Sequence, residues 1–373
     1  MRYSFNHMFI IIDSHEDLAW NIVNLKRDYT QSALDIRKAE KNTPIPAFNG
    51  NTLLGWPQYQ EGNIAIIFAT LYCSPKRLDK GKYPVRLYTT PEEAHSCYQE
   101  NLEVYHRLTG ENPDKFRLIR NQTDLARHLN QWQEHLSSSQ EPPPPVGIVI
   151  LMEGAEGIIE PAEVEQWYEW GVRVIGPAWA GNRYCGGTRE PGPLTKLGFA
   201  LLDHMAAFDL ILDISHMDHQ SALQALDTYD GTVIASHANA EALIKGIPIN
   251  RHLKDETIAQ LIERDGVMGI VPLNSFLDWN WRDHGGRDAI ALDYVIAQID
   301  YVCQMAGNTR HVALGTDFDG GFGVESVPYE IDTISDLPKL APHLTKRGYN
   351  EEDIARIFSD NWLRILKHNL PAS

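Results

Sequence analysis

Residues 8–17 read MFIIIDSHED, a short apolar run that ends in a cluster of acidic and imidazole side chains. The same order, an apolar run followed by an acidic or imidazole residue, recurs before Glu153, His216, His237 and Asp317. In a barrel of eight parallel strands, metal ligands and catalytic groups come from the C-terminal ends of different strands. The repeated pattern therefore predicts a (β/α)8 TIM barrel, of the α/β class, whose site is assembled from strand ends.

Eight apolar runs have the length of a β-strand and lack polar alternation, as expected for parallel strands buried on both faces. They lie at about residues 8–12, 64–70, 146–152, 172–176, 209–213, 232–235, 267–271 and 311–314. Amphipathic helical patterns lie between them, at residues 91–109, 122–136, 194–206, 218–229, 254–264, 288–306 and 351–368. Alternating strands and helices predict a parallel sheet, and eight repeats predict that it closes as a barrel.

The longest interval between two expected strands is residues 71–145, between the second and the third. It contains two of the helical patterns and ends in a Pro-rich connector at residues 137–145. No composition shift or internal repeat marks a boundary. We therefore interpret the interval as an insertion or elaborated crossover within a single domain of residues 1–373.

The composition excludes several classes of partner. The 373 residues include 33 Lys and Arg against 50 Asp and Glu, a net charge of −17 with His neutral. An acidic surface repels nucleic acid and anionic membranes, so we expect neither as a partner.

The apolar run Met8–Ile12 is too short for a signal-peptide core, and no segment approaches a membrane span. The four cysteines form no C-x-x-C pair. These features predict a cytoplasmic protein.

The strand-end residues have the chemistry of metal ligands. His15 and Asp17 are two residues apart, so on an extended segment they point to the same side and reach one ion. His216 and His237 each follow a serine at the ends of consecutive expected strands. Imidazole and carboxylate groups suit zinc and similar divalent cations, and one carboxylate such as that of Glu153 has two oxygens with which to bridge two ions. Each residue alone is equally typical of a solvated loop or a buried histidine, so the prediction depends on the whole set.

Asp317 follows the last expected strand, in the sequence GTDFDGG of residues 315–321. A carboxylate in this position would orient a metal-activated water and carry its proton to a leaving group. Asp319 and the glycines are typical of a tight loop, and we expect Asp319 to be structural.

These motifs resemble those of the membrane (renal) dipeptidase family of zinc peptidases, among the amidohydrolase-like metal-dependent barrels. The resemblance covers almost the whole chain. Its motifs are DSHEDLAW at 13–20, DISH at 213–216, SHANA at 236–240, RHLKD at 251–255, GTDFDG at 315–320 and DNWLR at 360–364.

The resemblance implies a site for two zinc ions and a dipeptide substrate. His15 and Asp17 would hold one ion, His216 and His237 the other, and Glu153 would bridge them. Asp317 would be the acid/base. Arg251 matches a family arginine that binds the substrate carboxylate, a task that suits a bidentate guanidinium. The family also suggests a homodimer.

One segment departs from the family pattern. After the fourth strand the family usually has His-x-x-Asn, whose His contacts the substrate and polarises its carbonyl. Here Asn182 is retained, and Trp179 stands where that His is expected. Tryptophan has an N–H donor but cannot carry a proton, so Arg183 or Tyr184 is expected to supply the missing donor.

This departure leaves more than one function open. The leading hypothesis is a binuclear zinc hydrolase that cleaves a small amide bond, most simply that of a dipeptide. The second keeps the metal site but acts on a non-peptide amide, lactam or lactone. The third is a metal-binding barrel without catalysis. Residues 276–286, with two tryptophans and a Gly-Gly pair, are either a lid over the cavity or a surface loop or subunit contact.

Overall fold

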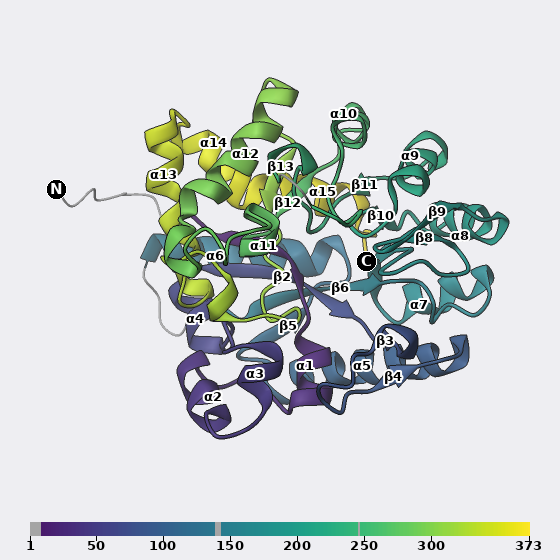
Figure 1. The fold of residues 1–373 in the computed structure, drawn as a ribbon, viewed down its shortest axis with the longest axis horizontal. Coiled ribbons are helices and arrows are strands. Elements are labelled where there is room, and N and C mark those ends of the chain that lie inside the picture. The colour runs from purple at the N-terminus through teal and green to yellow at the C-terminus, as the bar shows by residue number, and fades with distance from the viewer. Residues whose placement is uncertain (1–8, 139–142, 245–246) are drawn as a thin grey trace.

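Eight parallel strands form a barrel in the computed structural model, which describes residues 9–138, 143–244 and 247–373. The strands are β1 (Ile11–Glu16), β2 (Ile64–Leu71), β6 (Val146–Glu153), β7 (Val172–Gly176), β10 (Ile211–Asp213), β11 (Val233–Ile234), β12 (Met268–Ile270) and β13 (Val312–Leu314). Their order is β11-β10-β7-β6-β2-β1-β13-β12, and a parallel bridge between Ala235 and Met268 joins the two ends. The predicted (β/α)8 fold is confirmed (Figure 1).

Every expected strand overlaps an observed one, and the largest difference is in the first. It begins at Ile11 and continues to Glu16, so His15 lies in the strand and not after it. Met8 lies outside the described residues. The added length arises because β1 pairs with β2 as far as Glu16, across an irregular register.

Helices surround the barrel between its strands. They are α1 (Leu18–Leu25), α2 (Ala33–Glu40), α3 (Ile45–Asn49), α4 (Trp56–Glu61), α5 (Pro91–Glu111), α6 (Gln122–Ser138), α7 (Val164–Glu169), α8 (Lys196–Ala206), α9 (His219–Thr228), α10 (Asp255–Glu263), α11 (Asn274–Leu277), α12 (Leu292–Ala306), α13 (Leu340–Arg347), α14 (Glu351–Ala355) and α15 (Asn361–Asn369). The helical pattern at residues 351–368 is observed as α14 and α15, separated by one π-helical segment, Arg356–Asp360. At the start of α5 a reciprocal capping box between Thr90 and Glu93 satisfies backbone N–H groups at the helix end.

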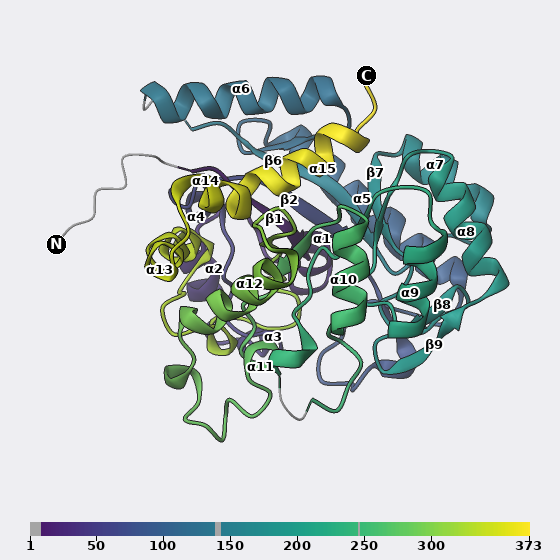
Figure 2. The same ribbon diagram turned by 90° about the horizontal axis from the view of Figure 1, so that it is seen from above.

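The barrel is filled with side chains and covered at its N-terminal end. Seven of the eight strands, together with Val267 directly before β12, contribute to one buried cluster: Ile12, Ile66, Phe68, Val149, Leu151, Val174, Ile211, Ile234, Val267 and Ala313. Trp362 of α15 and Trp132 of α6 belong to the same cluster, and Trp362 Nε1 donates to Leu314 O at 2.9 Å. Figure 2 shows α6 and α15 together on one side of the molecule, opposite α3 and α11. The other end of the barrel, at the C-terminal ends of the strands, is left for the site.

The interval of residues 71–145 contributes to the barrel sheet itself. It contains β3 (Ser74–Pro75), β4 (Leu87–Tyr88) and β5 (Phe116–Leu118), besides α5 and α6. Strand β5 pairs in parallel with the start of β6, with Phe116 opposite Val146. The sequence predicted the two helices of this interval but not this ninth strand, which is only three residues long.

His128 on α6 makes stability sensitive to pH. Its side chain is fully buried, and its Nε2 lies 2.8 Å from Ala65 O at the start of β2. Burial lowers the pKa of His128 from 6.5 to about 4. Because the unfolded chain then binds more protons than the folded one, stability is complete above pH 6.5 and is lost as pH falls toward 4, by about 3 kcal/mol. We expect His128→Gln to flatten the pH dependence of the urea unfolding midpoint across this window. An unchanged slope would contradict this assignment.

Candidate active site

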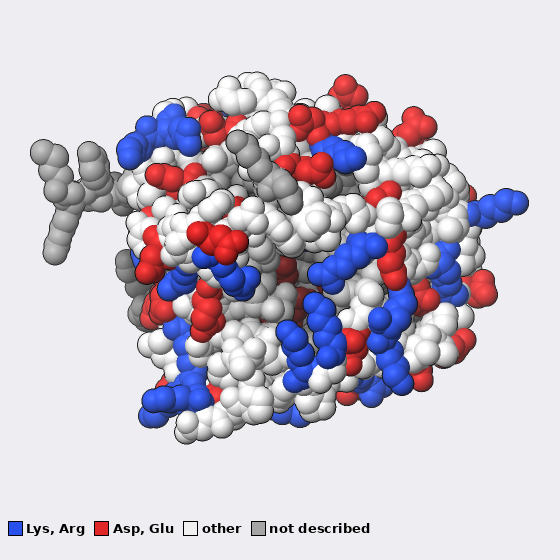
Figure 3. Space-filling view, viewed as in Figure 1, with Lys and Arg blue, Asp and Glu red and all other residues white. Residues whose placement is uncertain are grey.

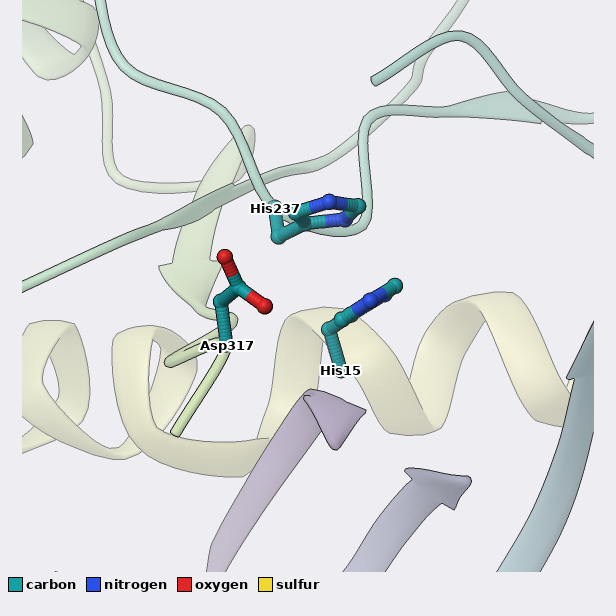
Figure 4. A group of neighbouring side chains, drawn as sticks. All are labelled: His15, His237 and Asp317. Atoms are coloured by element: carbon teal, nitrogen blue, oxygen red, sulfur yellow. The ribbon is translucent and has the colours of Figure 1, made fainter. Parts of the chain in front are cut away.

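The structure brings together all five predicted metal ligands and Asp317. His15 and Asp17 lie at and just after the end of β1, and Glu153 is the last residue of β6. His216 and His237 follow the ends of β10 and β11. All five ligands are buried. Figure 4 shows the side chains of His15, His237 and Asp317 directed toward one another at the ends of their strands.

Three imidazoles converge on one oxygen of Glu153. Its Oε1 lies 3.0 Å from Nε2 of His216, 3.4 Å from Nε2 of His237 and 3.6 Å from Nε2 of His15. The Nε2 atoms of His216 and His237 are 2.9 Å apart. The rings of His15 and His237 are stacked with their centroids 3.5 Å apart. The centre of the site therefore consists of closely spaced nitrogen and oxygen atoms that could coordinate a metal ion.

The second ring nitrogens show which Nε2 atoms are free to bind an ion. Ser236 Oγ donates its one proton to Asp213 Oδ2 at 2.5 Å, so it accepts from Nδ1 of His237 at 2.8 Å. His237 therefore carries its proton on Nδ1 and presents the lone pair of Nε2 to the site. Thr188 Oγ1 lies 2.9 Å from Nδ1 of His216 and orients that ring in the same way. Such contacts to the distal nitrogen are typical of metal-bound histidines.

This donor set fits divalent cations. The ligand atoms form three overlapping groups, each within 4.8 Å: His15, Asp17 and Glu153; Glu153, His216 and His237; His15, His237 and Asp317. The buried Nε2 of His15 has no hydrogen-bond partner in the part of the chain that the structure describes. An unsatisfied buried nitrogen and adjacent imidazole lone pairs are costly without a cation to bind them. The residues present are those that zinc prefers.

The electrostatics of the site point in the same direction. Burial raises the pKa of Glu153 well above its usual value, and the negative charges of Asp17 and Asp317 raise it further. Burial also raises the pKa of Asp17 to about 6. The site thus gathers three carboxylates, and the positive charge of Arg251 offsets only part of the rise in the pKa of Glu153 and Asp317. Bound divalent cations would remove this repulsion.

A second layer of acids holds the ligand-bearing strand ends together. Asp213 of β10 accepts from the backbone N–H groups of Ser215 and Ser236 at 3.0 and 2.9 Å. Asp13 of β1 accepts from the backbone N–H of Thr316, after β13, at 2.7 Å. Sequence reasoning assigned no role to these two acids. The sequence did contain a signal, since Asp13 stands two residues before His15 and Asp213 three residues before His216.

Asp317 has the position and the chemistry of a proton carrier. Its backbone is left-handed, with φ 58°, and its N–H donates to His15 O at 3.1 Å. Unlike the five ligands it is only partly buried, and it lines the cavity. Burial raises the pKa of Asp317 well above its usual value, and the charge of Asp17 adds to this effect. A raised pKa brings a carboxyl group closer to the pH at which it exchanges protons efficiently.

Arg251 is fixed beside the ligands. It is 3% exposed, and its Nη1 and Nη2 donate to Ser215 O at 2.8 Å and to His237 O at 2.9 Å. Its guanidinium carbon lies 5.1 Å from the centre of the Phe276 ring. Its positive charge is thus held at the cavity wall by the backbone of two ligand-bearing loops.

The predicted substrate contacts divide into two groups. Trp179 lines the cavity, with its ring 5.3 Å from Tyr72 and 6.1 Å from His216. Asn182, Arg183 and Tyr184 do not line it.

The prediction that Arg183 or Tyr184 donates a hydrogen bond to the substrate was therefore wrong, because neither side chain lines the cavity. Tyr184 Oη and Arg183 Nη2 both donate to the carbonyl of Ile158. Asn182 Nδ2 donates to Pro177 O at 2.8 Å, and its Oδ1 accepts from the backbone N–H of Tyr184. The three side chains hold the loop after β7 in place.

The cavity has a volume of about 390 Å³, and several aromatic side chains line it. Trp20 of α1, Phe48 of α3 and Tyr72 directly after β2 line it, and sequence reasoning missed all three because they come from separate parts of the chain. Phe276 also lines it. Of the segment predicted as a lid or surface loop, Trp281 is instead buried in the main hydrophobic core. The interval after β2 also contributes to the lining, with Leu78, Asp79, Lys80, Lys82, Val85 and Leu87.

The family model of the membrane dipeptidases, peptidase family M19, matches residues 4–371. This chain belongs to the membrane dipeptidase family. It is therefore a hydrolase of the class that acts on peptide bonds, and it belongs to a family of metallopeptidases. Among the described residues of this family member, no helix has the length and apolar character needed to cross a membrane.

Relatives of this dipeptidase-family chain occur in bacteria and fungi. An uncharacterized dipeptidase of Schizosaccharomyces pombe is 24% identical over 96% of this chain and 80% of its own length. An uncharacterized protein from the pqqA 5′ region of Klebsiella pneumoniae is 32% identical over 60% of this chain and 82% of its own.

Solved structures share the fold. A metallopeptidase from Rhodobacter sphaeroides, liganded with a phosphinate mimic of the dipeptide L-Ala-D-Ala, has a TM-score of 0.75 at 21% identity and covers 97% of this chain and 100% of its own. The probable dipeptidase PvdM from Pseudomonas aeruginosa has a TM-score of 0.77 at 16% identity, covering 99% of this chain and 97% of its own.

Proposed function

We propose that this protein is a dipeptidase that uses two zinc ions to hydrolyse the peptide bond of a dipeptide. The observation that carries the proposal is the convergence of three imidazole Nε2 atoms on one oxygen of Glu153, at 3.0 to 3.6 Å, beside Asp317. His15 and Asp17 would hold one ion, His216 and His237 the other, and Glu153 would lie between them. When bound, zinc ions supply Lewis acidity that polarises the scissile carbonyl and lowers the pKa of a water molecule.

Asp317 moves the proton in this proposal. The attacking water loses a proton to the Asp317 carboxylate as its oxygen bonds to the carbonyl carbon. Asp317 then gives that proton to the departing amine nitrogen as the C–N bond breaks. A raised pKa makes the Asp317 carboxylate a stronger proton acceptor, which favours the first transfer.

Arg251 and Trp179 position the substrate. Arg251 carries a buried positive charge beside the ligands, and it would bind the carboxylate of the dipeptide. Trp179 would contribute apolar contact and an indole N–H where the family usually has an imidazole. The cavity of about 390 Å³ suits a ligand of dipeptide size. The related Rhodobacter sphaeroides enzyme binds a dipeptide mimic, which supports the same substrate class here. A homodimer and a cytoplasmic location stay predictions.

The replacement of the expected histidine by Trp179 favours a second candidate, hydrolysis of a lactam or lactone at the same metal site. Both candidates are tested by assaying the zinc-reconstituted protein on a panel of dipeptides beside simple lactams and lactones, before and after chelation. We expect dipeptide hydrolysis that chelation abolishes and zinc restores. Turnover of lactones without dipeptides would establish the second candidate. Zinc binding without turnover of any of these substrates would indicate a metal-binding barrel without catalysis.

A further inference from the structure

The cavity has opposite charges at its two ends. Its floor holds the carboxylates of Asp17, Glu153 and Asp317, whereas its exposed lining includes three cations, Lys80, Lys82 and Arg189, and one acid, Asp79. Figure 3 shows Lys and Arg side chains gathered beside a hollow near the centre of this face, with Asp or Glu atoms visible inside it. The chain as a whole has a net charge of −17, so a cationic rim at this one opening is not the background of the surface.

The three rim cations have no acidic partner. Within residues 9–138, 143–244 and 247–373, no carboxylate lies within the 4.0 Å of an ion pair from Lys80, Lys82 or Arg189. Two arginines of the same segment are paired. Arg77 lies 2.7 Å from Glu190, and Arg86 lies 3.0 Å from Glu100. The three cations that line the cavity are therefore available to a ligand.

Arg189 is held in place by its backbone. It lies in the two-residue turn between β8 (Cys185–Gly187) and β9 (Glu190–Leu194), with φ 67°, a left-handed conformation that costs energy for a residue other than glycine. Its N–H donates to Asn250 Oδ1 at 2.7 Å, and Asn250 in turn donates to Gly187 O and Asp218. A strained residue kept by surrounding hydrogen bonds is typical of a ligand-binding position.

We propose that the preferred substrates are dipeptides with an acidic side chain, whose second carboxylate is bound by the rim of Lys80, Lys82 and Arg189. The inference depends on the proposed dipeptidase function. In this arrangement Arg251 binds the carboxylate of the peptide backbone at depth, and the rim binds the side-chain carboxylate at the opening. A neutral amide of the same shape makes no ion pair with the rim and is the poorer substrate.

The test compares substrates that differ only in charge, with the zinc-loaded enzyme. We expect kcat/KM to be about tenfold or more higher for Ala-Glu or Glu-Ala than for the matching glutamine dipeptide, as hydrogen bonds between charged groups allow. This ratio should decrease as salt is added. Combining K80Q, K82Q and R189Q should bring it close to one. K80E with K82E should reverse the preference toward lysine dipeptides.

Lys76→Gln is the matched control, because Lys76 is exposed in the same segment but does not line the cavity. It should leave the ratio unchanged. Hydrolysis of neutral and acidic dipeptides at equal kcat/KM, or a ratio that survives the triple substitution, would overturn the inference and leave the dipeptidase function standing. Failure to hydrolyse any dipeptide would instead overturn the proposed function and the inference with it.

Discussion

Asp317→Asn is expected to lower kcat by about 10²–10⁴-fold while the protein keeps two zinc ions. The amide has nearly the same shape as the carboxylate but cannot accept and return the proton that moves from water to the leaving amine. The measurement is kcat on a neutral dipeptide, together with zinc content by elemental analysis. Asp317 also lies within 4.8 Å of His15 and His237 as a third ligand-type group, so the metal content decides its role. Loss of one ion together with activity would make Asp317 a ligand and not the proton carrier.

Asp319→Asn is the matched control, two residues along the same loop. Asp319 is fully buried, lies 3.0 Å from Arg27 Nη1 and accepts from Tyr29 Oη at 2.7 Å. Removing one partner of a buried ion pair costs about 3–5 kcal/mol. We therefore expect Asp319→Asn to lower the thermal midpoint strongly, whereas Asp317→Asn leaves it nearly unchanged. This result would assign Asp317 to catalysis and Asp319 to stability.

Glu153→Gln is expected to reduce bound zinc from two ions to one or fewer and to lower kcat/KM by at least about 10³-fold. The carboxylate of Glu153 is the one acidic group that lies beside three ligand imidazoles, at 3.0 to 3.6 Å. In the absence of metal, we expect Glu153→Gln to stabilise the folded protein. Burial and the charges of Asp17 and Asp317 disfavour the ionised form of Glu153. The metal-free variant should therefore unfold at a higher temperature than the metal-free wild type.

With zinc the order should reverse, because ions that bind only the folded state stabilise it by about 4 kcal/mol at a concentration a thousandfold above Kd. Thermal midpoints of both proteins, with and without zinc, test this reversal. Glu156→Gln serves as the control, since Glu156 follows in the same loop, is partly buried and pairs with Arg183 at 3.9 Å away from the ligands. It should keep both ions. A Glu153→Gln protein with two ions would exclude the bridging position.

The sequence predicted the fold because buried parallel strands have a strong signature. Runs such as VGIVILM before Glu153 are apolar on both faces, and a barrel covered by helices buries eight of them. Ligands were predictable for the same reason, since each lies within a few residues of a strand end. Strand β5 was missed because three residues carry too little periodicity to separate a strand from a loop.

The walls of the cavity were not predictable, because long-range packing decides them. Trp20, Phe48 and Tyr72 come together only when α1, α3 and the end of β2 are folded. Tyr184 illustrates the opposite error. Its proximity in sequence to Trp179 suggested a shared role, but the hydroxyl donates to Ile158 O and points away from the cavity lining. Side chains that are close in the sequence of a loop can point in opposite directions, so their spacing does not show which of them face the cavity.

Thr188 and Arg189 occupy the two positions of one hairpin turn, and each serves a different property of the enzyme. The hydroxyl of Thr188 lies 2.9 Å from Nδ1 of His216, whereas the neighbouring guanidinium of Arg189 reaches the cavity opening. Lengthening or reshaping this turn to change what the enzyme accepts would also shift the group that orients a metal ligand. If the proposed preference for acidic dipeptides holds, selectivity would be changed with least disturbance by side-chain replacements at Arg189, Lys80 and Lys82, with the length of the turn kept.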